Sequence, residues 1–146
     1  MSDWASPMVI TGGLFAGGAA TIALYRAPIW RRMPAEEFVG DFEQTLRLTD
    51  PVQPALLVTT IVSTGGLALT ADGSARLLAS VGAAGFVVSL AAALTYLVPL
   101  QRSIAATPPA EADAIDGMRA RWLRGNLGRS MLAAASFVAV ALAATR

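Results

Sequence analysis

Four long apolar segments dominate this chain of 146 residues and constrain its fold most strongly. A helix needs roughly 20 mostly apolar residues to cross about 30 Å of hydrocarbon. Because charged residues make up only 14% of the chain, a water-soluble domain of this size would lack the polar surface to cover itself. The segments therefore predict membrane-spanning helices at about residues 7–25, 54–70, 77–100 and 122–145.

The predicted fold is all-α, a single four-span membrane domain over residues 1–146 folded as a four-helix bundle. Between the first two spans, apolar residues recur at helical spacing, and the acidic and polar residues lie largely on the other side. This pattern predicts an amphipathic cytoplasmic helix that lies on or caps the bundle and ends at Asp50-Pro51. Its apolar face is formed by Ala35, Phe38, Val39, Phe42 and Leu46.

The distribution of arginine predicts the orientation of the spans. Arg26, Arg31, Arg32 and Arg47 follow the first span, and Arg102, Arg119, Arg121 and Arg124 precede the uncharged part of the fourth. The opposite side has only Arg76 and Arg146. Cytoplasmic loops are enriched in basic residues, so we expect both termini outside and both long loops in the cytoplasm. All basic residues are Arg, as is usual for a GC-rich bacterial genome, so we expect the bacterial cytoplasmic membrane.

The absence of Cys and His excludes several kinds of site. A disulfide, a cysteine nucleophile, a Ser-His-Asp site, the usual zinc sites and His-ligated haem all need one of these residues. Glu37, Asp41 and Gln44 share a helical face but offer only two carboxylates, so we expect no metal. A net charge of +1 indicates no nucleic-acid partner.

Glycines at helical spacing occur in two of the spans. Gly13 and Gly17 form a Gly-x-x-x-Gly pair in the first, and Gly82 and Gly85 lie close together in the third. Small residues let helices approach closely in lipid. Packing inside the bundle is the favoured interpretation, and dimerisation is the alternative.

The start of the fourth span carries the most informative polar residues. Trp122, Asn126 and Arg129 are spaced four and three apart, so they share one helical face. A buried amide needs hydrogen-bond partners, and an arginine at this depth is a functional-site hypothesis by default. The alternative is that Arg129 extends to the headgroups while Trp122 belongs to the interfacial aromatic belt.

Other polar residues are expected at the same membrane face. Tyr96 and Gln101 lie near the end of the third span, Arg26 ends the first, and Asp50 precedes the second. If the helix ends converge, these residues form a polar vestibule in which Asp50 or Glu37 balances Arg129 or Arg26. The alternative is a set of solvated loop charges.

The order of these features resembles the anthrone oxygenase-like membrane family over roughly residues 10–145. The matching stretches are Gly13 to Gly17, Ala27 to Pro34, Phe38 to Gln44 leading into Asp50-Pro51, Val98 to Arg102, and the Trp122, Asn126, Arg129 signature. The chain departs from the family at Gln101, where many relatives have Asn. It also lacks a histidine that some members have, which excludes a His-dependent base here.

The resemblance implies a four-helix membrane protein that oxidises a flat, apolar anthrone-type or phenolic molecule with molecular oxygen and without a cofactor. In that hypothesis Arg129 and Asn126 stabilise the enolate oxygen, and Asp50 or Glu37 is the base. The substrate-binding residues would be Trp122, Tyr96, Gln101 and Arg26.

Two other functions are open on the sequence alone. A non-catalytic membrane subunit, in a homo-oligomer or a larger complex, would suit the short chain and its small-residue faces. A transporter is less compatible, because none of the four apolar cores contains an acidic residue. Copurification of a stoichiometric partner would favour the subunit, whereas a closed pocket that reaches Arg129 would favour the enzyme. Membrane lipid is an expected partner in each case.

Overall fold

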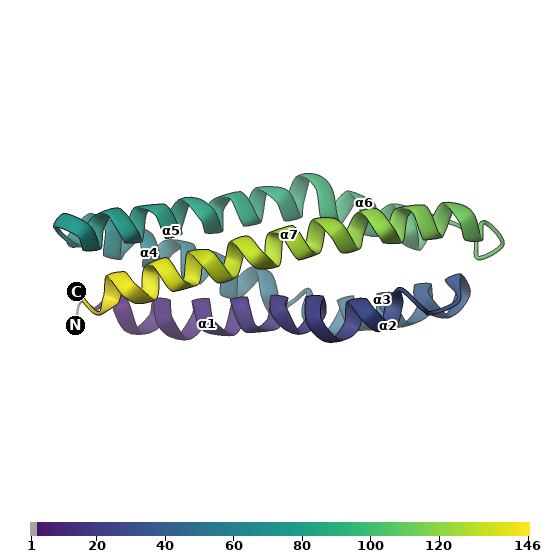
Figure 1. Ribbon diagram of the computed structural model, residues 1–146, viewed down its shortest axis with the longest axis horizontal. Helices are drawn as coiled ribbons and strands as arrows, with labels where there is room; N and C mark the ends of the chain where they lie inside the picture. The colour runs from purple at the N-terminus through teal and green to yellow at the C-terminus, as the bar shows by residue number, and fades with distance from the viewer. Residues whose placement is uncertain (1–2) are drawn as a thin grey trace.

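The structure, a computed structural model, describes residues 3–146, and within this range the chain is helical apart from short connections. Four helical columns run side by side, and both termini lie at the same end of the molecule (Figure 1). The elements are α1 (Ala5–Thr21), η1 (Ile22–Arg26), α2 (Ala27–Trp30), α3 (Ala35–Thr49), α4 (Gln53–Thr70), α5 (Gly73–Ala92), η2 (Ala93–Leu97), α6 (Val98–Ala106) and α7 (Ala112–Ala144).

Four helical stretches are long and apolar enough to cross a membrane, which confirms the predicted all-α, four-span fold. They are Ala5–Trp30, Gln53–Thr70, Gly73–Ala106 and Ala112–Ala144. Helix α7 packs against α5 and α1, and α4 packs against α1 and α5. The chain is therefore a multi-pass membrane protein built as a helical bundle.

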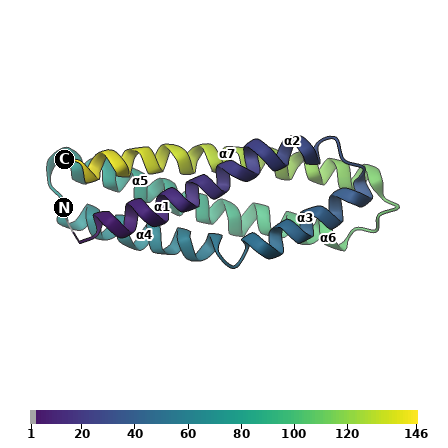
Figure 2. The same cartoon turned by 90° about the horizontal axis from the view of Figure 1, so that it is seen from below.

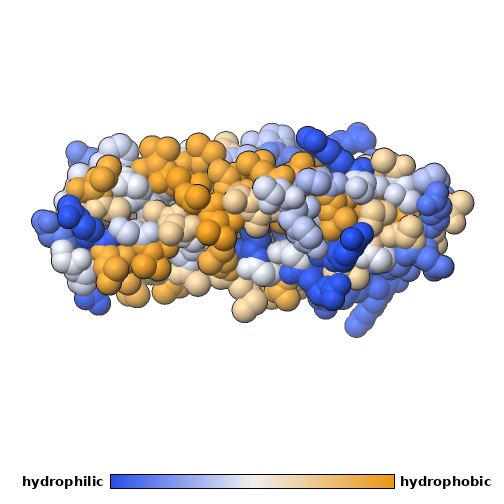
Figure 3. Space-filling view, turned by 90° about the horizontal axis from the view of Figure 1, so that it is seen from above, coloured by the Kyte–Doolittle hydropathy of each residue, from blue (hydrophilic) through white to orange (hydrophobic). Residues whose placement is uncertain are grey.

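The bundle is longer than a membrane is thick. With 33 residues, α7 extends about 50 Å, whereas α4 extends about 27 Å and matches the hydrocarbon layer. Beyond the start of α4, helix α3 continues the same column alongside α2, α6 and the first half of α7 (Figure 2). In Figure 3 apolar residues gather over the part of the bundle that contains α4, and hydrophilic residues gather over the α2–α3–α6 end.

The part of the bundle around α4 has an apolar core that is centred on Phe15, Leu57 and Phe86. Phe15 and Phe86 meet edge to face, with ring centroids 6.2 Å apart. Two hydroxyl groups in this core bond to other helices: Thr60 Oγ1 donates to Thr11 Oγ1 at 2.9 Å, and Ser130 Oγ donates to the carbonyl of Ala19 at 3.2 Å. The buried hydroxyls of Thr60 and Thr64 in the second span thus have hydrogen-bond partners inside the bundle.

The α2–α3–α6 end has a second core, which is aromatic. Trp30, Phe38, Phe42 and Trp122 are all buried and meet one another with ring centroids 4.9–5.9 Å apart. Phe38 and Phe42 come from α3, so the predicted apolar face of the amphipathic helix is the face that packs inward. Helix α3 caps the end of the bundle against α7 and α6.

Two short π-helical segments, η1 and η2, interrupt the first and third columns. Pro28 has no N–H, so the carbonyl of Leu24 loses its α-helical donor. The N–H of Ala27 instead bonds to Ile22, five residues back, and the N–H of Val98 bonds to Ala93 in the same way just before Pro99. The second column breaks between α3 and α4, at Pro51. Three of the four columns are thus irregular.

The glycines of the spans serve mainly to bring helices together. A Cβ at Gly82 would lie 2.2 Å from Val140 Cγ1, and a Cβ at Gly85 would lie 2.0 Å from Ser136 Oγ, so α5 and α7 approach closely here. Gly13 faces Phe137, whereas a Cβ at Gly17 would meet nothing. Packing inside the bundle accounts for these glycines except Gly17.

Candidate functional site

A cavity of about 110 Å³ lies where the helical columns are irregular. Ile22 from η1, Leu94 and Leu97 from η2, and Asp50 from the α3–α4 connection all line it. The helices diverge from regular packing at these points, which leaves space between them. The remaining walls combine apolar and polar side chains. The polar ones are Thr49, Asp50, Gln53, Gln101, Trp122, Asn126 and Arg129.

One wall of the cavity is the α7 face that carries Trp122, Asn126 and Arg129. Trp122 and Asn126 are buried, and Arg129 is partly buried with its guanidinium 5.6 Å from the ring of Phe15. Arg129 Nη2 donates to Asn126 Oδ1 at 3.3 Å, which orients the amide. The structure therefore turns Arg129 inward, toward Phe15 and the cavity.

These same three side chains carry hydrogen-bond donors that have no partner among residues 3–146. The atoms are Trp122 Nε1, Asn126 Nδ2 and Arg129 Nε, and each is buried. A buried donor without an acceptor costs about 1–3 kcal/mol, so three on one wall are an exceptional concentration. An oxygen-bearing ligand in the cavity would supply the missing acceptors.

Asp50 lines the cavity from the α3–α4 connection, and the residue as a whole is exposed, with only part of its surface covered. It forms no ion pair within the described chain, so it does not neutralise Arg129 by direct contact. Partial burial raises the pKa of the Asp50 carboxyl, and the positive charge of Arg129 acts in the opposite direction. The result is a carboxylate that binds a proton more readily than a free aspartate does.

Gln53 is a cavity residue that the sequence did not single out. It lines the cavity at the start of α4, and its Oε1 is buried with no partner in the part of the chain described. A Cβ at Gly18 would collide with Gln53 Nε2, so a larger residue there would displace the amide end of this side chain. A glutamine before a proline has no distinctive sequence signal; the close approach of Gly18 is visible only in three dimensions.

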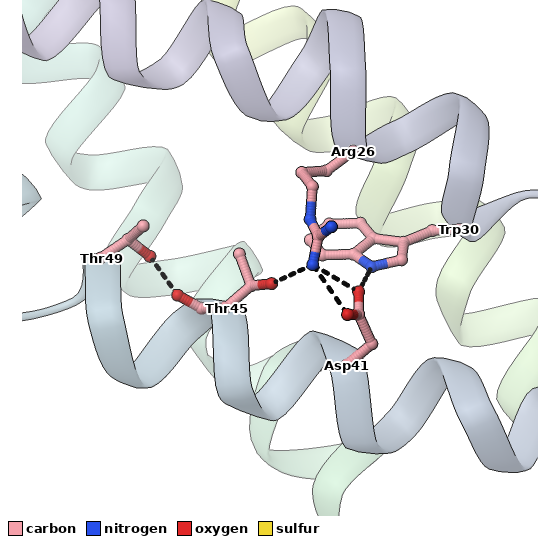
Figure 4. A network of polar contacts seen from close by, with 5 residues as sticks. All are labelled: Arg26, Trp30, Asp41, Thr45 and Thr49. Atoms are coloured by element: carbon pink, nitrogen blue, oxygen red, sulfur yellow. Dashed lines mark hydrogen bonds and ion pairs between the residues drawn. The ribbon is translucent and has the colours of Figure 1, made fainter.

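Arg26 does not line the cavity, although the sequence analysis placed it in the substrate site. Its Nη2 contacts both carboxylate oxygens of Asp41, at 2.8 and 2.7 Å, and Thr45 Oγ1 at 2.9 Å (Figure 4). Trp30 Nε1 donates to the same carboxylate. Asp41, rather than Asp50 or Glu37, therefore balances Arg26. The partners come from different helices, so helical spacing alone could not identify them.

Two further predicted residues also lie outside the cavity. Glu37 is exposed on α3 beside a shallow groove with Arg32. Tyr96 is 46% exposed, its ring packs over Gly125, and its hydroxyl donates to the carbonyl of Arg121 at 3.5 Å. The structure thus brings together Arg129, Asn126, Asp50, Trp122 and Gln101 and leaves out Glu37, Tyr96 and Arg26.

The cavity continues outward into a groove between α3 and α6. This groove has a volume of about 430 Å³, and it shares Leu46, Asp50, Val98 and Gln101 with the cavity. Its outer edge carries Glu43, Arg47 and Arg102. A molecule bound with one edge in the cavity can therefore extend into the groove.

The geometry suits a particular kind of chemistry. Fixed donors on one wall favour an oxygen on which negative charge develops, because they need no rearrangement as the charge forms. A carboxylate with a raised pKa on the facing side can take up a proton. Apolar residues such as Leu57, Leu90 and Leu97 complete the walls and limit water. Among residues 3–146 no group of three acidic side chains is arranged to hold a metal ion.

Comparison with known protein families gives a match that covers most of the last three of the four columns. A family model described as "Anthrone oxygenase" matches residues 42–139, which include α4, α5, α6 and most of α7. The matched region contains Asp50, Gln101, Trp122, Asn126 and Arg129; the motifs of the first span precede it. No curated protein and no solved structure matches the chain. Since the match spans more than half of its residues, the chain belongs to the anthrone oxygenase family.

Proposed function

We propose that this protein is a membrane-embedded, cofactor-independent oxygenase that acts on a flat, apolar anthrone-type or phenolic molecule. The single observation that carries the proposal is the set of three unpartnered donors on α7. They line the same cavity as a carboxylate of raised pKa. Membership of the anthrone oxygenase family supports the reaction class.

The proposed reaction begins with proton transfer. Asp50 removes a proton from the CH₂ group of the anthrone, and the electron pair moves to the carbonyl oxygen. Trp122, Asn126 and Arg129 stabilise the resulting enolate oxygen by hydrogen bonds. The enolate then gives electrons to O₂, and its carbon forms a bond to oxygen to give a hydroperoxide. Loss of water from the hydroperoxide leaves a second carbonyl, so anthrone and O₂ become anthraquinone and H₂O. The substrate supplies all the electrons.

The site is compatible with a flat substrate if only part of the molecule enters the cavity. At about 110 Å³ the cavity is smaller than the roughly 300–1,000 Å³ of typical ligand pockets. The adjoining groove of about 430 Å³ provides the remaining space. We propose that the carbonyl-bearing edge lies against α7 while the rest of the ring system extends between α3 and α6.

We further propose that the protein lies in the bacterial cytoplasmic membrane with both termini outside. The arginine-rich α2–α3–α6 end would then face the cytoplasm, as the positive-inside rule requires. Counting 16 residues from Arg129 to Thr145 gives about 24 Å, so the donors lie near the inner boundary of the hydrocarbon. A lipid-soluble substrate reaches this level from the bilayer.

The test is oxygen uptake by the purified protein with a simple hydroxyanthrone. We expect uptake well above the spontaneous rate, and a decrease of about 10²–10³-fold in Arg129→Ala because a donor to the enolate is lost. The control is Arg121→Gln, an exposed arginine on the same helix, which should keep wild-type activity. Circular dichroism of each variant checks that the helices are retained.

If wild-type protein consumes oxygen no faster than buffer, the anthrone substrate class is wrong. Equal loss of activity in Arg129→Ala and Arg121→Gln would contradict the placement of the site on the inner face of α7. In the first case a membrane subunit of a larger complex becomes the leading function, and copurification of a stoichiometric partner tests it.

A further inference from the structure

The arginines at the α2–α3–α6 end fall into two groups. The first group is paired: Arg26 with Asp41, Arg47 with Glu43, and Arg119 with Asp116. The second group has no carboxylate within ion-pair distance in residues 3–146. Outside the cavity, its members are Arg31, Arg32, Arg102, Arg121 and Arg124.

Two unpaired arginines, Arg31 and Arg124, line the same groove between the end of α2 and α7. This groove has a volume of about 400 Å³, and both side chains are exposed. Asp116 is the one acidic residue among its described lining, and it already pairs with Arg119 at 2.7 Å. The groove therefore presents two positive charges that no carboxylate of the described chain balances.

Arg119 makes the floor of this groove rigid. Its Nη1 donates to the carbonyl of Met33 at 2.6 Å, and its guanidinium lies 5.1 Å from the ring of Phe38. With a side chain only 12% exposed, Arg119 is fixed between α7, the α2–α3 connection and α3. The two free arginines thus project from a fixed base, which suits the recognition of one anionic group.

The same face of α7 becomes apolar in the direction of the membrane. Leu127 and Met131 follow Arg124 by three and seven residues, so they continue its face, and they are 41% and 65% exposed. The distance from Arg124 to Met131 along the helix axis is about 10 Å. A ligand with an anionic head at the arginines and an acyl chain along these residues would match both parts.

The geometry points to a binding site for an anionic phospholipid in the groove of Arg31 and Arg124. The phosphate lies between the two guanidinium groups, and the acyl chain lies along Leu127 and Met131. The groove is at the end of the bundle that projects beyond the hydrocarbon layer, at the level where headgroups are found. This site is separate from the cavity, so it does not depend on the proposed oxygenase activity.

The experiment is native mass spectrometry of the full chain in detergent with phosphatidylglycerol or phosphatidylcholine of identical acyl chains. We expect the wild type to bind phosphatidylglycerol about thirtyfold more tightly than phosphatidylcholine at low salt, because both arginines attract the anionic headgroup. The double variant Arg31→Gln, Arg124→Gln should reduce this preference to nearly one. Arg102→Gln, an exposed unpaired arginine on α6, is the matched control and should retain it.

Thermal unfolding with added lipid gives a second measurement. Phosphatidylglycerol should raise the melting temperature of the wild type but not of the double variant. Inorganic phosphate at millimolar concentration should have no such effect; if it replaces the lipid, the site takes a soluble anion and the lipid proposal is wrong. Equal binding of both lipids by the wild type, or equal loss in Arg102→Gln, would also overturn it.

Discussion

Two buried tryptophans in the aromatic end differ by a single hydrogen bond. Trp30 Nε1 donates to Asp41, whereas Trp122 Nε1 has no acceptor in the described chain. Their ring centroids are 5.8 Å apart, so both contribute to the same apolar cluster. Packing explains why both rings are aromatic, but it does not explain the unsatisfied N–H of Trp122. An acceptor atom of a ligand in the cavity would satisfy this N–H.

The substitution Trp122→Phe separates these two contributions. Phenylalanine keeps most of the ring contacts, so we expect a loss of stability of about 1–2 kcal/mol. It removes the N–H, so we expect kcat for hydroxyanthrone oxidation to fall about tenfold or more. Trp30→Phe is the control, since it should lose stability without a comparable loss of kcat. Equal kcat in Trp122→Phe and the wild type would show that this N–H does not contact the reacting oxygen.

Asp50→Asn tests the proposed base. We expect kcat/KM to fall about 10²–10⁴-fold, because an amide cannot accept the proton. In the wild type, burial raises the pKa of Asp50 while Arg129 opposes this, so activity should decline with falling pH at a pH above the usual aspartate range. A pH–rate profile measures this decline. An unchanged profile in Asp50→Asn would exclude Asp50 as the base.

The same pKa shift makes a prediction about stability. A carboxyl whose pKa is raised by folding stabilises the protein fully below its unfolded pKa, and this contribution is lost as pH rises through the folded value. At neutral pH the charged Asp50 is therefore unfavourable for folding, and Asp50→Asn should not lower the melting temperature. Asp113→Asn, an exposed residue at the start of α7, is the control for thermal unfolding.

At the scale of elements, the contact between α1 and the start of α4 fixes one side of the cavity. A Cβ at Gly18 would collide with the amide end of Gln53, so Gly18→Ala should displace this flexible side chain from the cavity wall and raise KM. A Cβ at the neighbouring Gly17 would meet nothing within 4 Å, so Gly17→Ala should leave stability unchanged or raise it slightly. Thermal unfolding and steady-state kinetics of the two variants measure the difference. Similar behaviour of both would contradict the close approach.

The ion pair between Arg26 and Asp41 joins the first column to α3. Arg26→Gln should lower stability by about 1 kcal/mol, because it removes the charged donor of Asp41 and leaves Trp30 Nε1 as its partner. KM should stay unchanged, since Arg26 does not line the cavity. A rise in KM without loss of stability would instead support the substrate-binding role predicted from the sequence. Arg47→Gln, whose pair with Glu43 is more exposed, serves as the control for the change in stability.

The sequence predicts those elements whose cause is local. Apolar runs of sufficient length specify the spans, and the spacing of Phe38 and Phe42 specifies the buried face of α3. The shared face of Trp122, Asn126 and Arg129 follows from helical periodicity. Contacts between columns do not follow from helical periodicity. Neither the pair of Arg26 and Asp41 nor the contact of Gln53 with Gly18 can be predicted from spacing along one helix. The first ten residues of α7, which begins at Ala112, lie outside the predicted span, because a polar helix outside the membrane has no hydropathy signal.

At the scale of the whole molecule, the orientation across the membrane can be measured directly. The chain has no cysteine, so single cysteines report their own accessibility without a background. We expect Ala110→Cys, in the α6–α7 connection, to resist a membrane-impermeant maleimide added to intact cells. Asp72→Cys, in the short α4–α5 connection, should react. The reverse pattern would show that the arginine-rich end faces outward.

The break between α3 and α4 has a consequence for how the site responds to change. Trp122, Asn126 and Arg129 lie on one continuous helix of 33 residues, so a change in the angle between helices leaves the distances among them unchanged. Asp50 lies at the joint between two separate helices, and its distance from that row depends on the angle of the joint. Substitutions at Pro51 and its neighbours can therefore change the position of Asp50 while the spacing of the three donors on α7 stays constant.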